Sequence, residues 1–392
     1  MLRRFTLFIA LALLFTSCSN AEKSPEPAVH SGQIINMRAR GYSLPIALED
    51  IAVGTVMHVT DSPVLDIAFI SDDLLAAVDY TGSLYSCSIS TQMVTKLEEL
   101  EESPSWSLTH AGDGRFLVWN KGDDGDYVCL DLNGEELWRY HYECFGGSPV
   151  MYSDLLFIPH CSQGNNSVAV LDQDGNVMVL INGSIGLLPS LIASPQGVIV
   201  LDSQGPHLLK LSGSTVTVEL WNEIWDQGLA RGRNVFLDAA NRLISHQLAS
   251  DEVVILAGTS NQPRIFNAER AFQQRSSSST WQSNPSFLAS NGDSLAILSE
   301  SGLYRFKDGA VETWVDNLDD LINATCPVSD FFIDRDCEAF IVLQSCCLAY
   351  GNERSEIIAF NQVAIGDLEF SQNYNLAAIG FQNGDIIIFN IQ

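Results

Sequence analysis

The chain has 392 residues, of which 46% are hydrophobic and 17% charged, so it is a globular protein of two ordinary domains or one large all-β domain. Its 20 basic and 48 acidic residues give a formal net charge of −28. Because an acidic surface repels phosphate groups, the composition argues against nucleic acid as a partner and against docking on anionic lipid by charge alone.

The first residues are typical of an export signal. Two arginines precede an apolar run from Phe5 to Phe15, which is too short to cross a bilayer as a mature helix. The run ends in the letters LFTSC, which resemble the lipobox of bacterial lipoproteins with Cys18 as the acylated residue. The resemblance implies that residues 1–17 are a signal peptide, that Cys18 carries lipid such as palmitate, and that Ser19 directs the protein to the outer membrane. An ordinary secretory signal, with Cys18 present by chance, is the alternative.

Residues 18–50 are predicted to form the lipidated cysteine and a flexible tether. The stretch NAEKSPEPAVHSGQ (20–33) is polar and contains two prolines, so it cannot bury enough apolar surface to fold. The folded domain is therefore predicted to span residues 51–392.

The domain begins with a predicted strand at Ile51–Val59 that has no hairpin partner beside it. Alternation with period two and turn residues then predict a four-stranded antiparallel meander between Val64 and Leu97. The same unit is predicted again over the ranges 106–140, 149–181, 189–220, 234–267, 285–315 and 328–362. A polar insertion at 268–284 separates the fifth of these seven units from the sixth.

The clearest hairpin lies in the second unit, at DYVCLDLNGEELWRY (126–140). Asn133-Gly134 between its two alternating runs predicts a type I′ turn, in which both central residues have positive φ. Similar hairpins are predicted at 168–180, 208–220 and 303–314. One hairpin cannot bury its apolar face alone, whereas a ring of repeated units can.

The last unit, 367–391, supplies three strands before the chain ends. Its letters LAAI from Leu376 match LAAV from Leu75, and the offset of 301 residues is seven times 43, a typical propeller period. The unpaired strand Ile51–Val59 can supply the missing fourth strand and so remove the exposed sheet edges. The predicted fold is an all-β, eight-bladed β-propeller, with seven blades as the main alternative and a pair of β-sandwiches as another.

The hairpin CLDLNGEELW (129–138) resembles the repeat of quinoprotein-like (PQQ-repeat-like) propellers, in which Leu-Asp, a turn glycine and a tryptophan recur. Leu130, Asp131, Gly134 and Trp138 fit this pattern, and a second hairpin fits it without the tryptophan. With this hairpin pattern, the lipid anchor and the predicted blade count, the chain is similar to the propeller lipoprotein subunit of the outer-membrane β-barrel assembly machine. The resemblance implies a lipid-anchored, non-catalytic protein that faces the periplasm and binds proteins. WD-repeat-like (WD40-like) propellers are similar too.

Eight cysteines remain besides Cys18, and an even number in an exported protein permits disulfide bonds. Two pairs each flank a short strand connection, and these are Cys144 with Cys161 and Cys326 with Cys337. The adjacent Cys346 and Cys347 resemble the ring of adjacent cysteines in quinoprotein alcohol dehydrogenases, although two buried or separately paired cysteines are favoured. Cys87 and Cys129 lie in the middle of strands and are predicted to be buried thiols.

No catalytic, cofactor-binding or metal-binding residue is predicted. The segment Asp172–Asn176 (DQDGN) resembles the start of a calcium loop, but its twelfth position is Gly183 instead of Glu, so a hairpin turn is favoured. The histidines His110, His141 and His160 lie near strand ends, where packed or surface roles are favoured over ligation. Most tryptophans are expected to pack between blades.

The hypothesis from sequence is a monomeric scaffold, anchored to the outer membrane by lipid, that binds unidentified envelope proteins and takes part in outer-membrane protein assembly. An enzyme is disfavoured but stays open as a quinoprotein-type oxidoreductase. A glycan-binding surface propeller is the third alternative, and its exposed residues would be Trp221, Trp225 and Trp281.

Overall fold

In the computed structural model, the described residues form strands that pair into sheets, antiparallel except where β1 (Gly41–Ser43) joins one of them. Within the described residues, no helix is both long and apolar enough to cross a membrane. The structure describes residues 41–43, 51–101, 103, 105–120, 124–143, 147–162, 165–182, 190–194, 196–202, 205–212, 215–220, 234–237, 242–247, 252–257, 264–267, 286–291, 294–299, 302–307, 310–316, 328–333, 339–343, 346–350, 355–359, 363–365, 368–371, 373 and 375–391.

The described strands make eight sheets, numbered here in chain order. The first sheet is β3 (Val64–Ser71), β4 (Leu74–Asp79), β5 (Ser83–Ser88) and β6 (Met93–Glu99). The second is β7 (Trp106–His110), β8 (Phe116–Asn120), β9 (Gly125–Leu130) and β10 (Glu136–Tyr142). The third is β11 (Val150–Tyr152), β12 (Leu155–Ser162), β13 (Asn165–Leu171) and β14 (Val177–Asn182). The fourth is β15 (Ser190–Ser194), β16 (Gly197–Asp202), β17 (Gly205–Ser212) and β18 (Thr215–Leu220).

The later sheets repeat the same order. The fifth is β19 (Asn234–Leu237), β20 (Arg242–Gln247), β21 (Glu252–Ala257) and β22 (Arg264–Asn267). The sixth is β23 (Ser286–Asn291), β24 (Ser294–Ser299), β25 (Gly302–Lys307) and β26 (Ala310–Asp316). The seventh is β27 (Val328–Ile333), β28 (Ala339–Leu343), β29 (Cys346–Tyr350) and β30 (Ser355–Ala359), and the eighth joins β31 (Glu369–Phe370), β32 (Leu376–Gly380) and β33 (Asp385–Ile391) to β2 (Ile51–His58).

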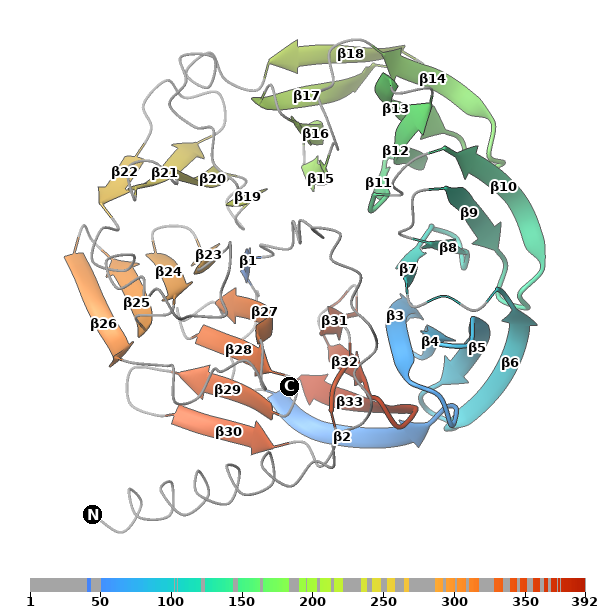
Figure 1. The fold of residues 1–392 in the computed structure, drawn as a ribbon, viewed down its shortest axis with the longest axis horizontal. Helices are drawn as coiled ribbons and strands as arrows, with labels where there is room; N and C mark the ends of the chain where they lie inside the picture. The colour runs from blue at the N-terminus through green and yellow to red at the C-terminus, as the bar shows by residue number, and fades with distance from the viewer. Residues whose placement is uncertain are drawn as a thin grey trace.

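Figure 1 shows the sheets following one another around a circle. In the first seven sheets the strand named first above lies near the middle and the strand named last lies outside, and in the eighth β31 lies near the middle and β2 outside. Where side chains are described, apolar ones fill the layers between neighbouring sheets, from the eighth and first to the third and fourth. Met57 and Ile386 of the eighth sheet pack with Leu75 of the first, and Leu84 of the first packs with Phe116 of the second. The core is therefore a series of layers between sheets, as the alternating strands predict.

The strand β2 pairs antiparallel with β33, from Ile51 opposite Ile391 to His58 opposite Asp385, with a register shift between Val53 and Val56. This pairing of the orphan strand with the last strand is the one the sequence predicts. The repeat alignment also holds, because Leu75 and Leu376 both lie in the second strand of their sheets. Strands far apart in sequence thus complete one sheet.

The connection from β2 to β3 is held by hydrogen bonds to the eighth and first sheets. The amides of Val59 and Thr60 donate to the carbonyl oxygen of Gly384, over 2.9 and 3.3 Å. The hydroxyl of Thr60 donates to the Asp79 carboxylate over 2.9 Å. The same carboxylate, 1% exposed as a residue, also accepts hydrogen bonds from Thr81, Ser83 and Tyr85. Asp79 therefore ties the incoming chain to the turn that follows β4.

The hairpins at 126–140, 168–180, 208–220 and 303–314 are confirmed as β9–β10, β13–β14, β17–β18 and β25–β26. The predicted type I′ turn is wrong. Gly134 has a φ of 85°, but Asn133 is not among the residues with positive φ. The Asp131 carboxylate accepts the amides of Asn133 and Glu135 over 2.8 and 2.9 Å, which supports a longer turn than two residues.

The first described segment lies inside the range predicted to be a tether. Residues Gly41–Ser43 form β1, which runs parallel to β27 with Tyr42 opposite Phe332. The sequence predicts no strand in 18–50, because three residues without alternation carry no strand signal. The inner edge of β27 thus gains a fifth strand from the N-terminal segment.

Candidate functional site

Along the outer strand β10 of the second sheet, alternate side chains point to opposite faces. Trp138, Tyr140 and Tyr142 point toward the third sheet, where they pack with the apolar layer. Arg139 and His141 alternate with them and are about half exposed. Because successive residues of a strand point to opposite faces, one strand both packs the core and displays charge.

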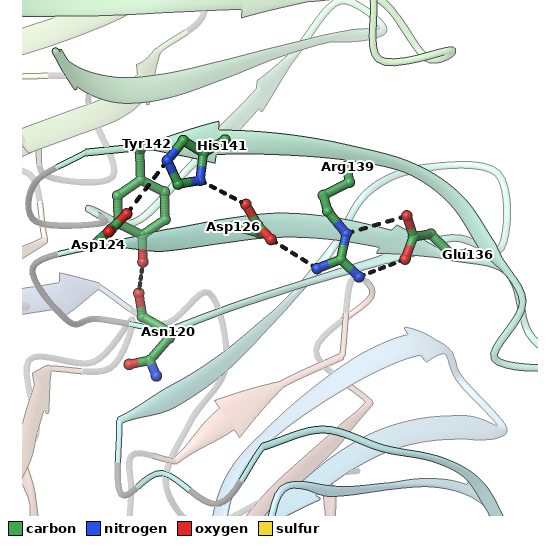
Figure 2. Close-up of polar contacts among 7 residues, drawn as sticks. All are labelled: Asn120, Asp124, Asp126, Glu136, Arg139, His141 and Tyr142. Atoms are coloured by element: carbon green, nitrogen blue, oxygen red, sulfur yellow. Dashed lines mark hydrogen bonds and ion pairs between the residues drawn. The ribbon is translucent and has the colours of Figure 1, made fainter.

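Arg139 and His141 belong to a cluster that also contains Asp124, Asp126 and Glu136, called here the rim cluster (Figure 2). The guanidinium of Arg139 donates to Glu136 Oε2 over 2.6 Å and to Asp126 Oδ2 over 2.7 Å. His141 Nδ1 lies 2.9 Å from Asp126 Oδ1, and its Nε2 lies 3.4 Å from Asp124 Oδ1. Asp126 therefore contacts both basic side chains of the exposed face of β10.

The electrostatics of the rim cluster follow from these contacts. The hydrogen bond to Asp126, with the charges of Asp124 and Glu143, raises the pKa of His141. Burial alone would raise the pKa of Asp126, but hydrogen bonds from Arg139 and His141 hold it below its ordinary value. The rim cluster thus places the Arg139 cation and a histidine of raised pKa against the same carboxylate, that of Asp126.

A second cluster repeats this geometry on the eighth sheet. His58, the last residue of β2, lies opposite Asp385 as His141 lies opposite Asp126. His58 Nδ1 is 2.8 Å from Asp385 Oδ1, and its Nε2 is 3.4 Å from Asp61 Oδ1. The hydrogen bond to Asp385 raises the pKa of His58. Two histidines are thus each placed between two aspartates on sheets that flank the first.

Three tyrosines on the face toward the third sheet make polar contacts. The Tyr140 hydroxyl lies 3.0 Å from His160 Nδ1 of β12, and burial lowers the pKa of His160. The Tyr127 hydroxyl donates to the carbonyl of Gly147 over 2.8 Å, and the Tyr142 hydroxyl donates to the carbonyl of Asn120 (Figure 2). Tyr140 and Tyr142 therefore anchor the outer strand β10 from its buried side.

Trp138 joins the second sheet to the turn before β14. Its indole Nε1 donates to the carbonyl of Gln173 over 3.0 Å. Its ring lies over Gly175, where an added Cβ would be 2.5 Å from Trp138 Cγ and the φ is +80°. Only glycine allows this approach, so the predicted packing of Trp138 between sheets is confirmed.

The segment Asp172–Asn176 is a turn, as the sequence predicts. The Asp172 carboxylate accepts the amides of Asp174 and Asn176 over 2.9 and 2.8 Å, and these bonds within the turn occupy it. The side-chain hydrogen bond from Asn176 is the main cause that lowers the pKa of Asp172. No group of three or more His, Cys, Asp or Glu side chains suited to a metal ion occurs in the part of the chain that is described.

The outer strand β14 of the third sheet differs from β10. Val177, Met178 and Leu180 are 49%, 47% and 42% exposed, and no residue of β14 carries a charge. Val179 and Ile181 point to the opposite face and pack against the fourth sheet. Next to the charged edge of β10, the molecule thus displays an apolar edge, and these two outer strands together are the candidate interaction surface.

Two of the predicted cysteines have described side chains, and the others do not. Cys87 and Cys129 are free and buried, as expected, and burial raises the pKa of their thiols to about 12 and about 11. Cys161 lies in β12, and Cys346 and Cys347 lie in β29 opposite Ala359 and Ile358, with only their backbone described. The remaining proposed cysteines lie outside the described residues, and these are Cys18, Cys144, Cys326 and Cys337.

The tryptophans proposed for glycan contact, Trp221, Trp225 and Trp281, also lie outside the described residues. Sequence reasoning missed the partner of His141, because Asp126 is 15 residues away and meets it only through the pairing of β9 with β10. The available signal was the alternation itself. Once the hairpin register is set, charged residues of the same parity face one another.

No protein-family model matches the chain, and no curated protein matches it. Among solved structures, the Dos1 propeller has a TM-score of 0.55 at 9% identity and covers 87% of this chain and 95% of that chain. BamB from Moraxella catarrhalis has a TM-score of 0.53 at 12% identity, covering 87% and 99%. The C-terminal WD40 domain of Sif2 has the same values. The chain has a β-propeller fold. Identities this low show the fold alone.

Proposed function

We propose that this protein is a lipid-anchored β-propeller of the bacterial cell envelope that acts as a non-catalytic scaffold for protein partners. Its ring has eight blades, one for each described sheet, and β2 closes it by completing the last blade. The antiparallel register from Ile51 to His58 supports this closure, as do the hydrogen bonds of Val59 and Thr60 to Gly384. A closed ring supplies a rigid platform without a free end of the sheet stack.

The exposed side of β10 and β14 is the observation that carries the scaffold proposal. Arg139 and His141 are held by carboxylates, while Met178 and Leu180 stand exposed on the neighbouring sheet. Protein interfaces combine an apolar centre with a polar, charged margin, and a rigid platform lowers the entropy lost on binding. The surface has both parts on strands whose other face is buried.

The cellular setting is proposed from the sequence. The segment LFTSC supports lipidation of Cys18, and the resemblance to the propeller subunit of the outer-membrane β-barrel assembly machine supports an outer-membrane location and a role in protein assembly there. The likeness in fold to BamB is consistent with this proposal. The partners would be envelope proteins, bound while the lipid holds the propeller at the membrane.

The proposal is tested by expressing the full chain and its Cys18→Ala variant in a bacterium with an outer membrane. We expect labelled palmitate to enter the wild-type chain alone, and wild-type protein to fractionate with the outer membrane. Crosslinking in intact cells should give discrete adducts with envelope proteins. Equal labelling of both chains would refute the anchor, and an absence of adducts at several positions of β10 and β14 would refute the scaffold.

A further inference from the structure

The outer strands of the sheets are protected unequally against pairing with another strand. Ion pairs occupy three of them, between Lys96 and Glu99 on β6, between Arg139 and Glu136 on β10, and between Lys210 on β17 and Glu219 on β18. Charged side chains on an edge discourage strand addition. Among the outer strands of the eight described sheets, only β2 and β14 contain no Asp, Glu, Lys or Arg.

The two uncharged outer strands differ in regularity. The register of β2 shifts between Val53 and Val56, in the middle of the strand. In β14 the shift lies at the start, next to Met178, and the pairing is regular from Val179 to Asn182. A bulge in the middle of a strand interrupts its hydrogen-bonding edge, whereas one at its start leaves the rest usable. Therefore β14 offers the more regular uncharged edge.

The surroundings of β14 define what could lie against it. Among the described strands it pairs with β13 alone, which leaves its outer backbone groups facing outward. Met178 and Leu180 share one face and are exposed, so a neighbouring strand would meet apolar side chains at every second position. The turn before β14 carries Asp174, whose side chain is exposed, and none of the ion pairs found among the described residues involves it.

We propose that the edge of β14 is a strand-addition site for an extended segment of a partner protein, with apolar residues at alternate positions and a basic C-terminal end. Addition of an antiparallel strand continues the antiparallel pairing of the third sheet, and antiparallel pairing is slightly more stable than parallel pairing. It places the C-terminal end of the segment at the start of β14, beside the turn with the exposed Asp174. Main-chain hydrogen bonds would supply affinity, and the alternate apolar contacts and the basic end would supply specificity. This inference rests on the proposed scaffold function and specifies its partner.

The test uses a fluorescein-labelled peptide of the sequence Val-Thr-Val-Thr-Val-Lys-Lys and the purified full chain. We expect saturable binding in fluorescence polarisation, weakened about tenfold or more by Leu180→Lys, because a charge then lies at the proposed contact. Val218→Lys is the matched control, since Val218 is also 42% exposed and lies on the outer strand β18. It should change the affinity by less than about twofold. Asp174→Asn should weaken binding about threefold, and the effect should fade in high salt.

Circular dichroism of each variant should match the wild type, because the substituted side chains are exposed. A peptide with proline in place of both threonines should not bind, since it lacks the backbone N–H groups. The inference is overturned if the wild-type chain does not bind the peptide, if Leu180→Lys and Val218→Lys bind alike, or if the proline peptide binds equally well. Envelope adducts without peptide binding would keep the scaffold and reject this edge. Peptide binding without envelope adducts would keep β14 as a strand-addition site and reject the scaffold function in the envelope.

Discussion

Asp79 and Asp126 are carboxylates with several partners each, but their surroundings are opposite. Asp79 is buried and accepts five hydrogen bonds, all from neutral amides and hydroxyls of three segments of the chain. The side chain of Asp126 is 26% exposed, and its partners are the basic side chains of Arg139 and His141 on one neighbouring strand. One site joins distant segments, while the other organises a surface.

The pKa values of Asp79 and Asp126 are both lowered, but for different reasons. Burial would raise the pKa of Asp79, and hydrogen bonds from Thr81, Thr60, Ser83 and Tyr85 outweigh it. At Asp126, hydrogen bonds from Arg139 and His141 outweigh burial. Loss of a buried acceptor leaves its donors unsatisfied, whereas loss of an exposed acceptor lets water replace it. Similar pKa directions therefore correspond to large and small effects on stability.

The largest expected effect is that of Asp79→Ala. The substitution leaves the buried amide of Ser83 and the part-buried donors of Thr81, Tyr85 and Thr60 without their acceptor, so we expect a loss of about 3 kcal/mol of unfolding free energy. Urea unfolding followed by tryptophan fluorescence measures it.

Thr60→Val is the graded control, because it removes one of the five bonds and should cost about 1 kcal/mol. Asp126→Ala is the control from the rim cluster and should cost about 0.5 kcal/mol. Equal losses in Asp79→Ala and Asp126→Ala would contradict the distinction between the two sites.

An effect of intermediate size is expected in the pH dependence of the unfolding free energy, which isolates the contribution of the Asp79 carboxylate. The folded-state pKa of Asp79 lies below its unfolded value of about 3.9, so its ionised form stabilises the fold above that pH. This contribution is lost as the pH falls through the folded-state pKa. We expect the difference in unfolding free energy between wild type and Asp79→Asn to be constant from about pH 5 to 7 and to shrink below about pH 4. A difference that stays constant down to pH 3 would contradict the assignment.

Much of the fold follows from local sequence, because alternation and turn residues determine each hairpin. The units around Leu75 and Leu376 repeat closely enough to align, and this alignment led to the pairing of β2 with β33. The predicted turn type at Asn133 was wrong because the turn depends on the Asp131 carboxylate, which accepts hydrogen bonds from the amides of Asn133 and Glu135. A dipeptide rule contains no term for such a side chain.

The candidate surface was less predictable than the fold. Asp126 and His141 meet through strand register, and the exposure of Leu180 depends on which face of β14 packs on the fourth sheet. The same alternation predicts both faces but does not say which is buried. The bond from Thr60 to Asp79 was also not foreseeable, because it joins the segment after β2 to the turn after β4.

The smallest effect is expected at His141 and concerns protonation. Its folded-state pKa is raised by the hydrogen bond to Asp126, so its contribution to stability is complete below its unfolded value of about 6.5 and is lost as the pH rises through the folded-state pKa. NMR titration of wild type and Asp126→Asn should show the pKa of His141 falling toward its ordinary value in the variant. His58 is the internal control, because it pairs with Asp385 and should titrate identically in both proteins. Since both histidines are exposed, added salt should lower both pKa values, and an unchanged His141 titration in Asp126→Asn would show that the rim cluster does not hold its charge through Asp126.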